Sequence, residues 1–331
     1  MKNLLSSEIN HTFKSDEALK SFLLKNYNFK DISSFELVSN GLNDTYKFYN
    51  NSELLFLRIY KKDWRTLSQI EAEVQILNLL QSSKFVHALP LLSVDEKHHC
   101  SLDFEEGERY VLVFKSSIGE EVELGLPHMK NLGLNLGELH LELQRVKNLD
   151  RPKFDKRHLM DEPLEIIKRF LPEDSADFRF LEQIITSIKP ELDYKGAQGI
   201  IHGDLHSLNV HFDKKDQPSI IDFDCCGYGL LNFDLAVVVF FTTLVGFRND
   251  DTMKLKLEKL DAFFEGYNVH RKLNELDHKN IWRLVLARHI WQLGILAGKA
   301  KFTDEEGAFP DLFYRANKIT KEWMKYFKIE L

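Results

Sequence analysis

Short runs of alternating apolar and polar residues fill the first third of the chain and predict a small antiparallel sheet. Turn sequences separate the first three runs, with NGLND at 40–44 and NNS at 50–52. The predicted strands are 35–39, 45–49, 53–60, 91–94, 100–104 and 109–115. Apolar residues recur at helical spacing between residues 65 and 80, which predicts one helix within this sheet region.

The pattern becomes mainly helical after residue 115. Leucines at helical spacing predict a helix over 130–146, and shorter helices are expected at 163–170 and 178–188. A strand, loop, hairpin and strand are predicted over 199–224, followed by helices to the end of the chain. We therefore expect an α+β protein with two lobes. Residues 1–115 would form a small β lobe and residues 116–331 a larger, mainly helical lobe.

Composition narrows the classes of function. The 331 residues carry a net charge of −7, which argues against a nucleic-acid-binding protein. The three cysteines form no CxxC pair, which favours a reduced, cytoplasmic protein. Residues 1–14 lack the apolar run of a signal peptide. The longest apolar stretch, 235–247, is too short to span a bilayer and predicts a buried helix, so no membrane partner is expected.

Two polar motifs carry the candidate chemistry. HGDLHSLN at 202–209 follows a predicted buried strand, and DFD at 222–224 follows a predicted hairpin. A hairpin of this length is expected to bring Asn209, at the start of one strand, close to Asp222, at the end of the next. Their oxygens suit a hard cation, whereas Asp204 remains available to accept a proton. These are the residue types that phosphoryl transfer from ATP requires.

A metallohydrolase is the competing interpretation of the same motifs. His202, Asp204, His206 and Asp222 are possible zinc ligands, and the DLH sequence resembles the opening motif of metallophosphoesterases. A loop does not impose helical i,i+4 geometry, however, and the later GNH and GHxH elements of that family are missing. We therefore expect His206 to be a loop histidine or to lie near the transferred phosphate.

The motif region resembles a known family. IIHGDLHSLNVHF and SIIDFDCCGYGLLNFDLA are similar to the catalytic core of the aminoglycoside phosphotransferase and choline kinase superfamily, whose fold is similar to that of protein kinases. LFLRIYKKDWRTLSQIEAEVQIL and GERYVLVFKSSIGE resemble the branch of type II homoserine kinases and bacterial stress-response kinases. The resemblance covers roughly residues 35–247. It implies that ATP or GTP binds with Mg²⁺, and that residues 1–115 form the nucleotide-binding lobe.

The resemblance also implies roles for individual residues. Asp204 corresponds to the catalytic base, and Asn209 and Asp222 to the metal ligands. The expected nucleotide-binding residues are Asn40, Gly41, Arg58, Glu73, Phe114 and Lys115. Arg58 departs from the family because most kinases have lysine there, and an arginine fork contacts phosphates with different geometry. Glu73, rather than Glu71, is its expected partner.

Further polar residues have expected roles, and for Asp224, Asp234 and Arg288 there is more than one interpretation. Asp224 either touches a second metal or bonds to nearby groups. Asp234 resembles the buried aspartate that braces the catalytic loop, and it also fits an N-cap of the following helix. His202 is expected to pack the loop. A helix containing Arg288 could face the substrate, although packing on the core is the preferred interpretation.

The expected activity is transfer of the γ-phosphoryl group of ATP to a hydroxyl of a small molecule, such as an amino alcohol or an aminoglycoside-type antibiotic. A protein serine/threonine kinase of the stress-response type and a nucleotide-binding pseudokinase are the alternatives. Intact Asp204, Asn209 and Asp222 argue against a pseudokinase, and Arg58 argues for one. The protein is expected to act as a monomer or homodimer.

Overall fold

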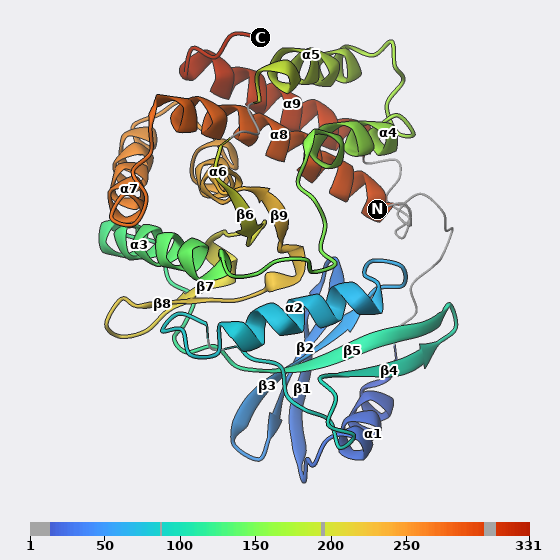
Figure 1. The fold of residues 1–331 in the computed structure, drawn as a ribbon. Coiled ribbons are helices and arrows are strands. Elements are labelled where there is room, and N and C mark those ends of the chain that lie inside the picture. The colour runs from blue at the N-terminus through green and yellow to red at the C-terminus, as the bar shows by residue number, and fades with distance from the viewer. Residues whose placement is uncertain (1–13, 87, 193–195, 301–308) are drawn as a thin grey trace. The chain divides into compact units, whose positions relative to one another are not determined.

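The structure is a computed structural model that describes residues 14–86, 88–192, 196–300 and 309–331 (Figure 1). These residues form two compact units. The first contains the described chain up to Ile118 together with Ser219–Asp224, and the second contains Gly119–Pro218 and the described chain from Cys225 onward. The first unit therefore includes residues 219–224, which the sequence analysis placed in the C-terminal lobe. The mixed composition of sheet and helices confirms the predicted α+β class.

Within the described residues up to Ile118, the first unit consists of an antiparallel sheet and two helices. The strands are β1 (Ile32–Asn40), β2 (Asn43–Asn50), β3 (Glu53–Tyr60), β4 (His99–Phe104) and β5 (Gly107–Lys115), in the spatial order β1-β2-β3-β5-β4. The helices are α1 (Asp16–Asn26) and α2 (Leu67–Leu79). Thr66 and Gln69 form a capping box that begins α2, because each side chain bonds to the other residue's main-chain N–H.

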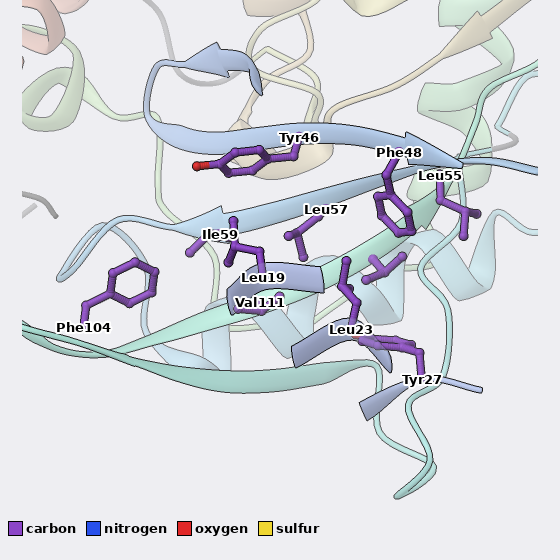
Figure 2. Close-up of a cluster of buried hydrophobic side chains, with 11 residues drawn as sticks. Leu19, Leu23, Tyr27, Tyr46, Phe48, Leu55, Leu57, Ile59, Phe104 and Val111 are labelled. Carbon is purple, nitrogen blue, oxygen red and sulfur yellow. The ribbon is translucent and has the colours of Figure 1, made fainter. Parts of the chain in front are cut away.

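The two faces of the sheet have different roles. Figure 2 shows α1 side chains, among them Leu19 and Leu23, packed against apolar residues of the sheet. On β3, Leu55, Leu57 and Ile59 belong to this cluster. Successive strand residues point to opposite faces, so the intervening Arg58 lies on the other face, with α2. The hydrophobic cluster thus fixes the strand that presents Arg58.

The second unit is mainly helical. Its α-helices are α3 (Leu126–Leu143), α4 (Glu162–Ile167), α5 (Ala176–Glu191), α6 (Asn232–Val239), α7 (Thr252–Tyr267), α8 (Glu275–Ala300) and α9 (Phe309–Tyr326). The π-helical turns are η2 (Arg157–Asp161) and η5 (Phe240–Leu244), and the 3-10 turn η3 is Ser207–Asn209. A further 3-10 turn, η4, spans Phe223–Cys225 at the unit boundary. Strands β6 (Gln198–Ile201) and β9 (Gly227–Leu230) pair antiparallel. Strand β7 (Val210–Phe212) also lies in this unit, whereas its hairpin partner β8 (Pro218–Ile220) crosses the unit boundary at Ser219.

Glycines let α3 and α7 approach each other closely. A Cβ on Gly133 would lie 1.9 Å from the carbonyl oxygen of Phe263, and a Cβ on Gly266 would lie 2.0 Å from that of Lys130. No side chain fits at these two positions, so the helix backbones meet directly. The contact fixes α3, which carries His140 toward the catalytic loop.

Most predicted elements are present, and several boundaries differ. The strand predicted at 91–94 is wrong: residues 91–93 have no regular structure, and Val94 begins a turn. Pro90 makes only an isolated bridge to Phe114, and proline lacks the N–H that would continue a ladder. The predicted helix 235–247 ends earlier, in the turn η5. Among the helices of the described chain, none combines the length and apolar character needed to cross a membrane.

Candidate active site

The catalytic-loop motif begins directly after β6. Gly203 has φ of +81°, and a Cβ there would lie 2.5 Å from the carbonyl oxygen of Cys225. Only glycine fits such a conformation and so close an approach. His202 is fully buried, and its Nδ1 accepts a hydrogen bond from the Asp204 N–H at 3.3 Å. The loop therefore holds the Asp204 backbone firmly, in agreement with the packing role expected for His202.

Asp234 braces this loop from helix α6. Its fully buried carboxylate accepts hydrogen bonds from the N–H groups of His202 (2.8 Å) and Gly203 (2.7 Å). His140 of α3 adds a third contact to the carboxylate, and its other ring nitrogen meets the Tyr267 hydroxyl of α7. The alternative N-cap interpretation is wrong, because α6 begins at Asn232 and Asp234 lies inside its first turn.

Replacing Asp234 with asparagine should leave at least one of these buried donors without an acceptor. We expect the free energy of unfolding to fall by about 1–3 kcal/mol, measured by urea denaturation. Asp261→Asn, on an exposed position of α7, is the matched control and should change it by less than about 0.5 kcal/mol. Equal effects of the two substitutions would contradict the bracing role.

Arg288 of α8 is the charged partner of Asp204. Its Nη2 donates to Asp204 Oδ1 at 2.5 Å, and His206 Nε2 lies 3.6 Å from Oδ2. Burial acts to raise the pKa of Asp204, but Arg288 and His206 outweigh it and lower the pKa to about 2. Asp204 is therefore a carboxylate at neutral pH. Because of its low proton affinity, it is better suited to orienting a hydroxyl than to removing its proton early.

The amide of Asn209 is oriented by the same loop, because its Nδ2 donates to the Asp204 carbonyl oxygen at 2.9 Å. No described residue donates to its Oδ1. Asn209 lies in the turn η3 and not, as expected, in the following strand, which begins at Val210. This side-chain-to-backbone bond closes the turn before the strand starts. An oxygen without a donor suits a hard cation.

In the first unit, Arg58 links two carboxylates. Nη1 donates to Glu73 Oε1 at 2.8 Å, and Nη2 donates to Asp222 Oδ1 at 2.9 Å. Glu73 is fully buried and also accepts from the Tyr60 hydroxyl at 2.9 Å. Burial favours a lower pKa for Arg58, but Asp222 and Glu73 raise the pKa well above its usual value. The predicted pairing of Arg58 with Glu73, rather than Glu71, is confirmed.

Asp222 has a φ of +63°, in the left-handed region that aspartate and asparagine adopt more readily than most residues other than glycine. It lies two residues beyond β8 instead of ending that strand. Its Oδ1 also accepts weakly from the Asp224 N–H, at 3.4 Å. Oδ2 accepts no hydrogen bond within the described chain, and the side chain is 45% exposed. One oxygen is therefore fixed by Arg58 and the other remains open.

Asp224 is held by side chains of the first unit. Its carboxylate accepts from Trp64 Nε1 (2.7 Å), Asn43 Nδ2 (3.1 Å) and Arg65 Nε (3.0 Å). Arg65 also donates to the Asp224 carbonyl oxygen at 2.8 Å. Of the two interpretations left open by the sequence, these contacts favour bonding to nearby groups over a second metal, because both carboxylate oxygens already have donors.

The other expected nucleotide-binding residues lie at strand ends of the first unit. Asn40 ends β1, and Gly41 is in the turn that follows, with Lys61 donating to Asn40 Oδ1 at 2.9 Å. Phe114 and Lys115 end β5. The Arg58 guanidinium lies 4.6 Å from the centre of the Phe114 ring. The Lys115 N–H already donates to Leu89, so it is not available to read an adenine edge.

The structure thus assembles the predicted residues as two groups, one in each unit. Asp204 and Asn209 lie together in the second unit, whereas Arg58, Glu73 and Asp222 lie together in the first. The sequence analysis missed the contacts that His140, Trp64, Arg65 and Arg288 make to the motif aspartates. Each partner is far away in sequence and carries no motif of its own.

The donor atoms fit a divalent cation bound with nucleotide phosphates. Within the part of the chain that is described, no cluster of three histidine, cysteine or acidic residues could hold a metal by itself. Asn209 Oδ1 and Asp222 Oδ2 are both oxygens without a hydrogen-bond donor there. Mg²⁺ prefers oxygen ligands of this kind, with one or two from the protein and the rest from phosphates and water, and each unit offers one such oxygen.

Comparison with known proteins identifies the class. The model of the phosphotransferase enzyme family matches residues 35–275. An uncharacterised protein of Synechocystis sp. is 30% identical over 294 residues, which cover 87% of this chain and 79% of the relative. The chain belongs to the phosphotransferase enzyme family, and it is accordingly a phosphotransferase.

Solved structures share the fold. A microcompartment-associated aminopropanol kinase has a TM-score of 0.77 at 21% identity, covering 95% of this chain and 98% of that chain. The amicoumacin kinase hAmiN, in complex with AMP-PNP, Ca²⁺ and Ami, has a TM-score of 0.76 at 18% identity, covering 93% and 94%. The choline kinase LicA from Streptococcus pneumoniae has a TM-score of 0.63 at 14% identity, covering 93% and 99%.

Proposed function

We propose that this protein transfers the γ-phosphoryl group of ATP to a hydroxyl of a small molecule. The observation that carries the proposal is Asp204, an ionised carboxylate on a braced loop, with the oriented Asn209 amide beside it. Similar structures named for kinases of aminopropanol, amicoumacin and choline favour a small acceptor over a protein. The branch resemblance adds homoserine to the candidate acceptors.

In this mechanism Asp204 accepts a hydrogen bond from the acceptor hydroxyl and takes its proton as the bond to phosphorus forms. Arg58 contacts phosphate oxygens while Glu73 keeps its guanidinium in place. Asn209 and Asp222 would hold Mg²⁺, which when bound neutralises charge on the phosphates. Because phosphoryl transfer has a loose transition state, positioning and charge supply most of the rate.

The proposal is tested by measuring ATP consumption with Mg²⁺ and a panel of acceptors: homoserine, aminopropanol, choline, several aminoglycosides and a generic protein substrate. Stimulation by one small acceptor supports the proposal and identifies the acceptor class. Phosphorylation of the protein substrate alone would favour the stress-response type of kinase. If ATP raises the melting temperature and no acceptor stimulates turnover, the result favours a pseudokinase, which binds the nucleotide without transferring its phosphoryl group.

Asp222→Asn tests the cation site separately. The asparagine oxygen can still accept from Arg58, but the charge that attracts the cation is lost. We expect the affinity for ATP with Mg²⁺ to fall about 10- to 100-fold, and the affinity for ATP without Mg²⁺ to change little. Calorimetric titration measures both, with the exposed Asp103→Asn as control. An unchanged Mg²⁺ dependence would remove Asp222 from the cation site.

A further inference from the structure

Arg288 is a buried cation that reaches the catalytic loop. Its side chain is 1% exposed, and one nitrogen, Nη2, donates to Asp204. Arginine is rarely buried so completely unless its charge and its donors are matched. The sequence analysis preferred core packing for this helix, whereas the structure shows a side chain that is buried and also touches the residue expected to act on the substrate.

The hydrogen-bonding capacity of Arg288 is only partly used. Within the described chain, neither Nε nor Nη1 has an acceptor. The guanidinium carbon lies 4.5 Å from the ring centre of Trp291, 5.7 Å from that of Phe240 and 5.6 Å from that of Phe241. These rings stabilise the positive charge but accept none of the in-plane N–H groups. Two donor nitrogens, which carry three N–H groups between them, therefore remain unmatched on the guanidinium that contacts Asp204.

The two oxygens of Asp204 face different groups. Oδ1 accepts from Arg288, whereas Oδ2 faces His206, whose Nε2 lies 3.3 Å from the Asn209 amide nitrogen. Arg288 and His206 therefore contact different oxygens of Asp204, and the Asn209 amide contacts the loop through His206 and the Asp204 carbonyl oxygen. An anion held by the remaining donors of Arg288 would lie near Asp204 while the guanidinium offsets the charge of both groups.

We propose that Arg288 binds an oxyanion beside Asp204 during the reaction. The inference rests on the proposed phosphotransferase function and adds a recognition element to its site. The oxyanion is either the phosphoryl group in transfer or a carboxylate carried by the acceptor, and both present oxygens that match the arginine fork. In either case the guanidinium shares its donors between Asp204 and the bound anion, which fills the donors that are unmatched in the free protein.

Binding of inorganic phosphate tests the inference without requiring turnover. We expect millimolar phosphate to raise the melting temperature of the wild type, and Arg288→Met to abolish this increase. Arg283→Met is the matched control. It removes an arginine from the same helix, one that pairs with Glu191 and is 25% exposed. Arg288→Lys keeps the positive charge and should retain part of the increase in melting temperature. This result would show that Arg288→Met loses the increase because the charge is gone and not because the protein is unfolded. Absence of the increase in the wild type, or an equal increase in Arg288→Met and Arg283→Met, overturns the proposal.

Steady-state kinetics assign the source of the oxyanion. If Arg288 binds the phosphoryl group, Arg288→Met should lower kcat by roughly 10²- to 10³-fold with every acceptor. If it binds an acceptor carboxylate, KM should rise roughly 10- to 100-fold for homoserine and stay unchanged for aminopropanol, which has no carboxylate. The proposal is overturned if kcat and KM of Arg288→Met equal those of Arg283→Met with both homoserine and aminopropanol. If the wild type has no turnover, the proposed function fails, while the phosphate experiment still reports on Arg288.

Discussion

Replacing Asp204 with asparagine is expected to lower kcat by roughly 10²- to 10⁴-fold, the usual contribution of a positioned general base. The asparagine oxygen can still accept from Arg288, so the buried guanidinium keeps a partner and the loop should keep its fold. The affinity for ATP should change little. Acceptor-stimulated ATP turnover measures kcat, and calorimetric titration measures the affinity for ATP.

The pH dependence follows from the same contacts. With a pKa of about 2, Asp204 is ionised at neutral pH, so it should add no acidic limb to the kcat profile above about pH 4. Its ion pair stabilises the fold above the ordinary aspartate pKa, and this contribution is lost as the pH falls toward 2. The charge of Arg288 is the largest single cause that lowers the pKa of Asp204, and His206 and His202 lower it further. Arg288→Met should therefore move the acidic limb to higher pH.

Replacing Arg58 with methionine is expected to destabilise the protein by about 3–5 kcal/mol, because Glu73 would remain buried and charged without its partner. The free energy of unfolding, measured in urea, checks this value. The substitution should also weaken ATP binding, since the proposed contact to phosphate oxygens is removed. Arg58→Lys, the residue that most related kinases have here, should recover part of both losses.

Two comparisons separate this effect from a general response to losing a charge. Lys47→Met breaks an exposed ion pair with Glu36 on the same sheet and should cost at most about 1 kcal/mol. The double substitution Arg58→Met with Glu73→Met should be less destabilising than Arg58→Met alone, because it removes the stranded charge. Equal losses for Arg58→Met and Lys47→Met would show that the buried pair does not stabilise the first unit.

The sequence predicted the elements that local pattern determines. The pattern of apolar residues identified β3 and α2, and the family resemblance singled out Arg58 on the first and Glu73 on the second as partners. The strand predicted at 91–94 is absent because an apolar run in the sequence does not show whether its N–H groups pair with a neighbouring strand. Leu91 donates to Val113, but its neighbours bond elsewhere.

The contacts around the motif aspartates were not predictable in this way. Arg288 is 84 residues from Asp204, and His140 is 94 residues from Asp234. Their pairing depends on how α3, α6 and α8 pack, and an arginine or histidine inside a helix gives no local signal of its partner. The Trp64 and Arg65 contacts to Asp224, about 160 residues apart, depend on tertiary structure in the same way.

The most direct measurement is acceptor-stimulated ATP turnover with Mg²⁺, comparing the wild type with Asp204→Asn across the acceptor panel. The account predicts that at least one small hydroxyl compound stimulates turnover by the wild type, and that the stimulation nearly disappears in Asp204→Asn although ATP still binds. Equal stimulated turnover by the two proteins would contradict the role of Asp204. No stimulation by any small acceptor would contradict the proposed function.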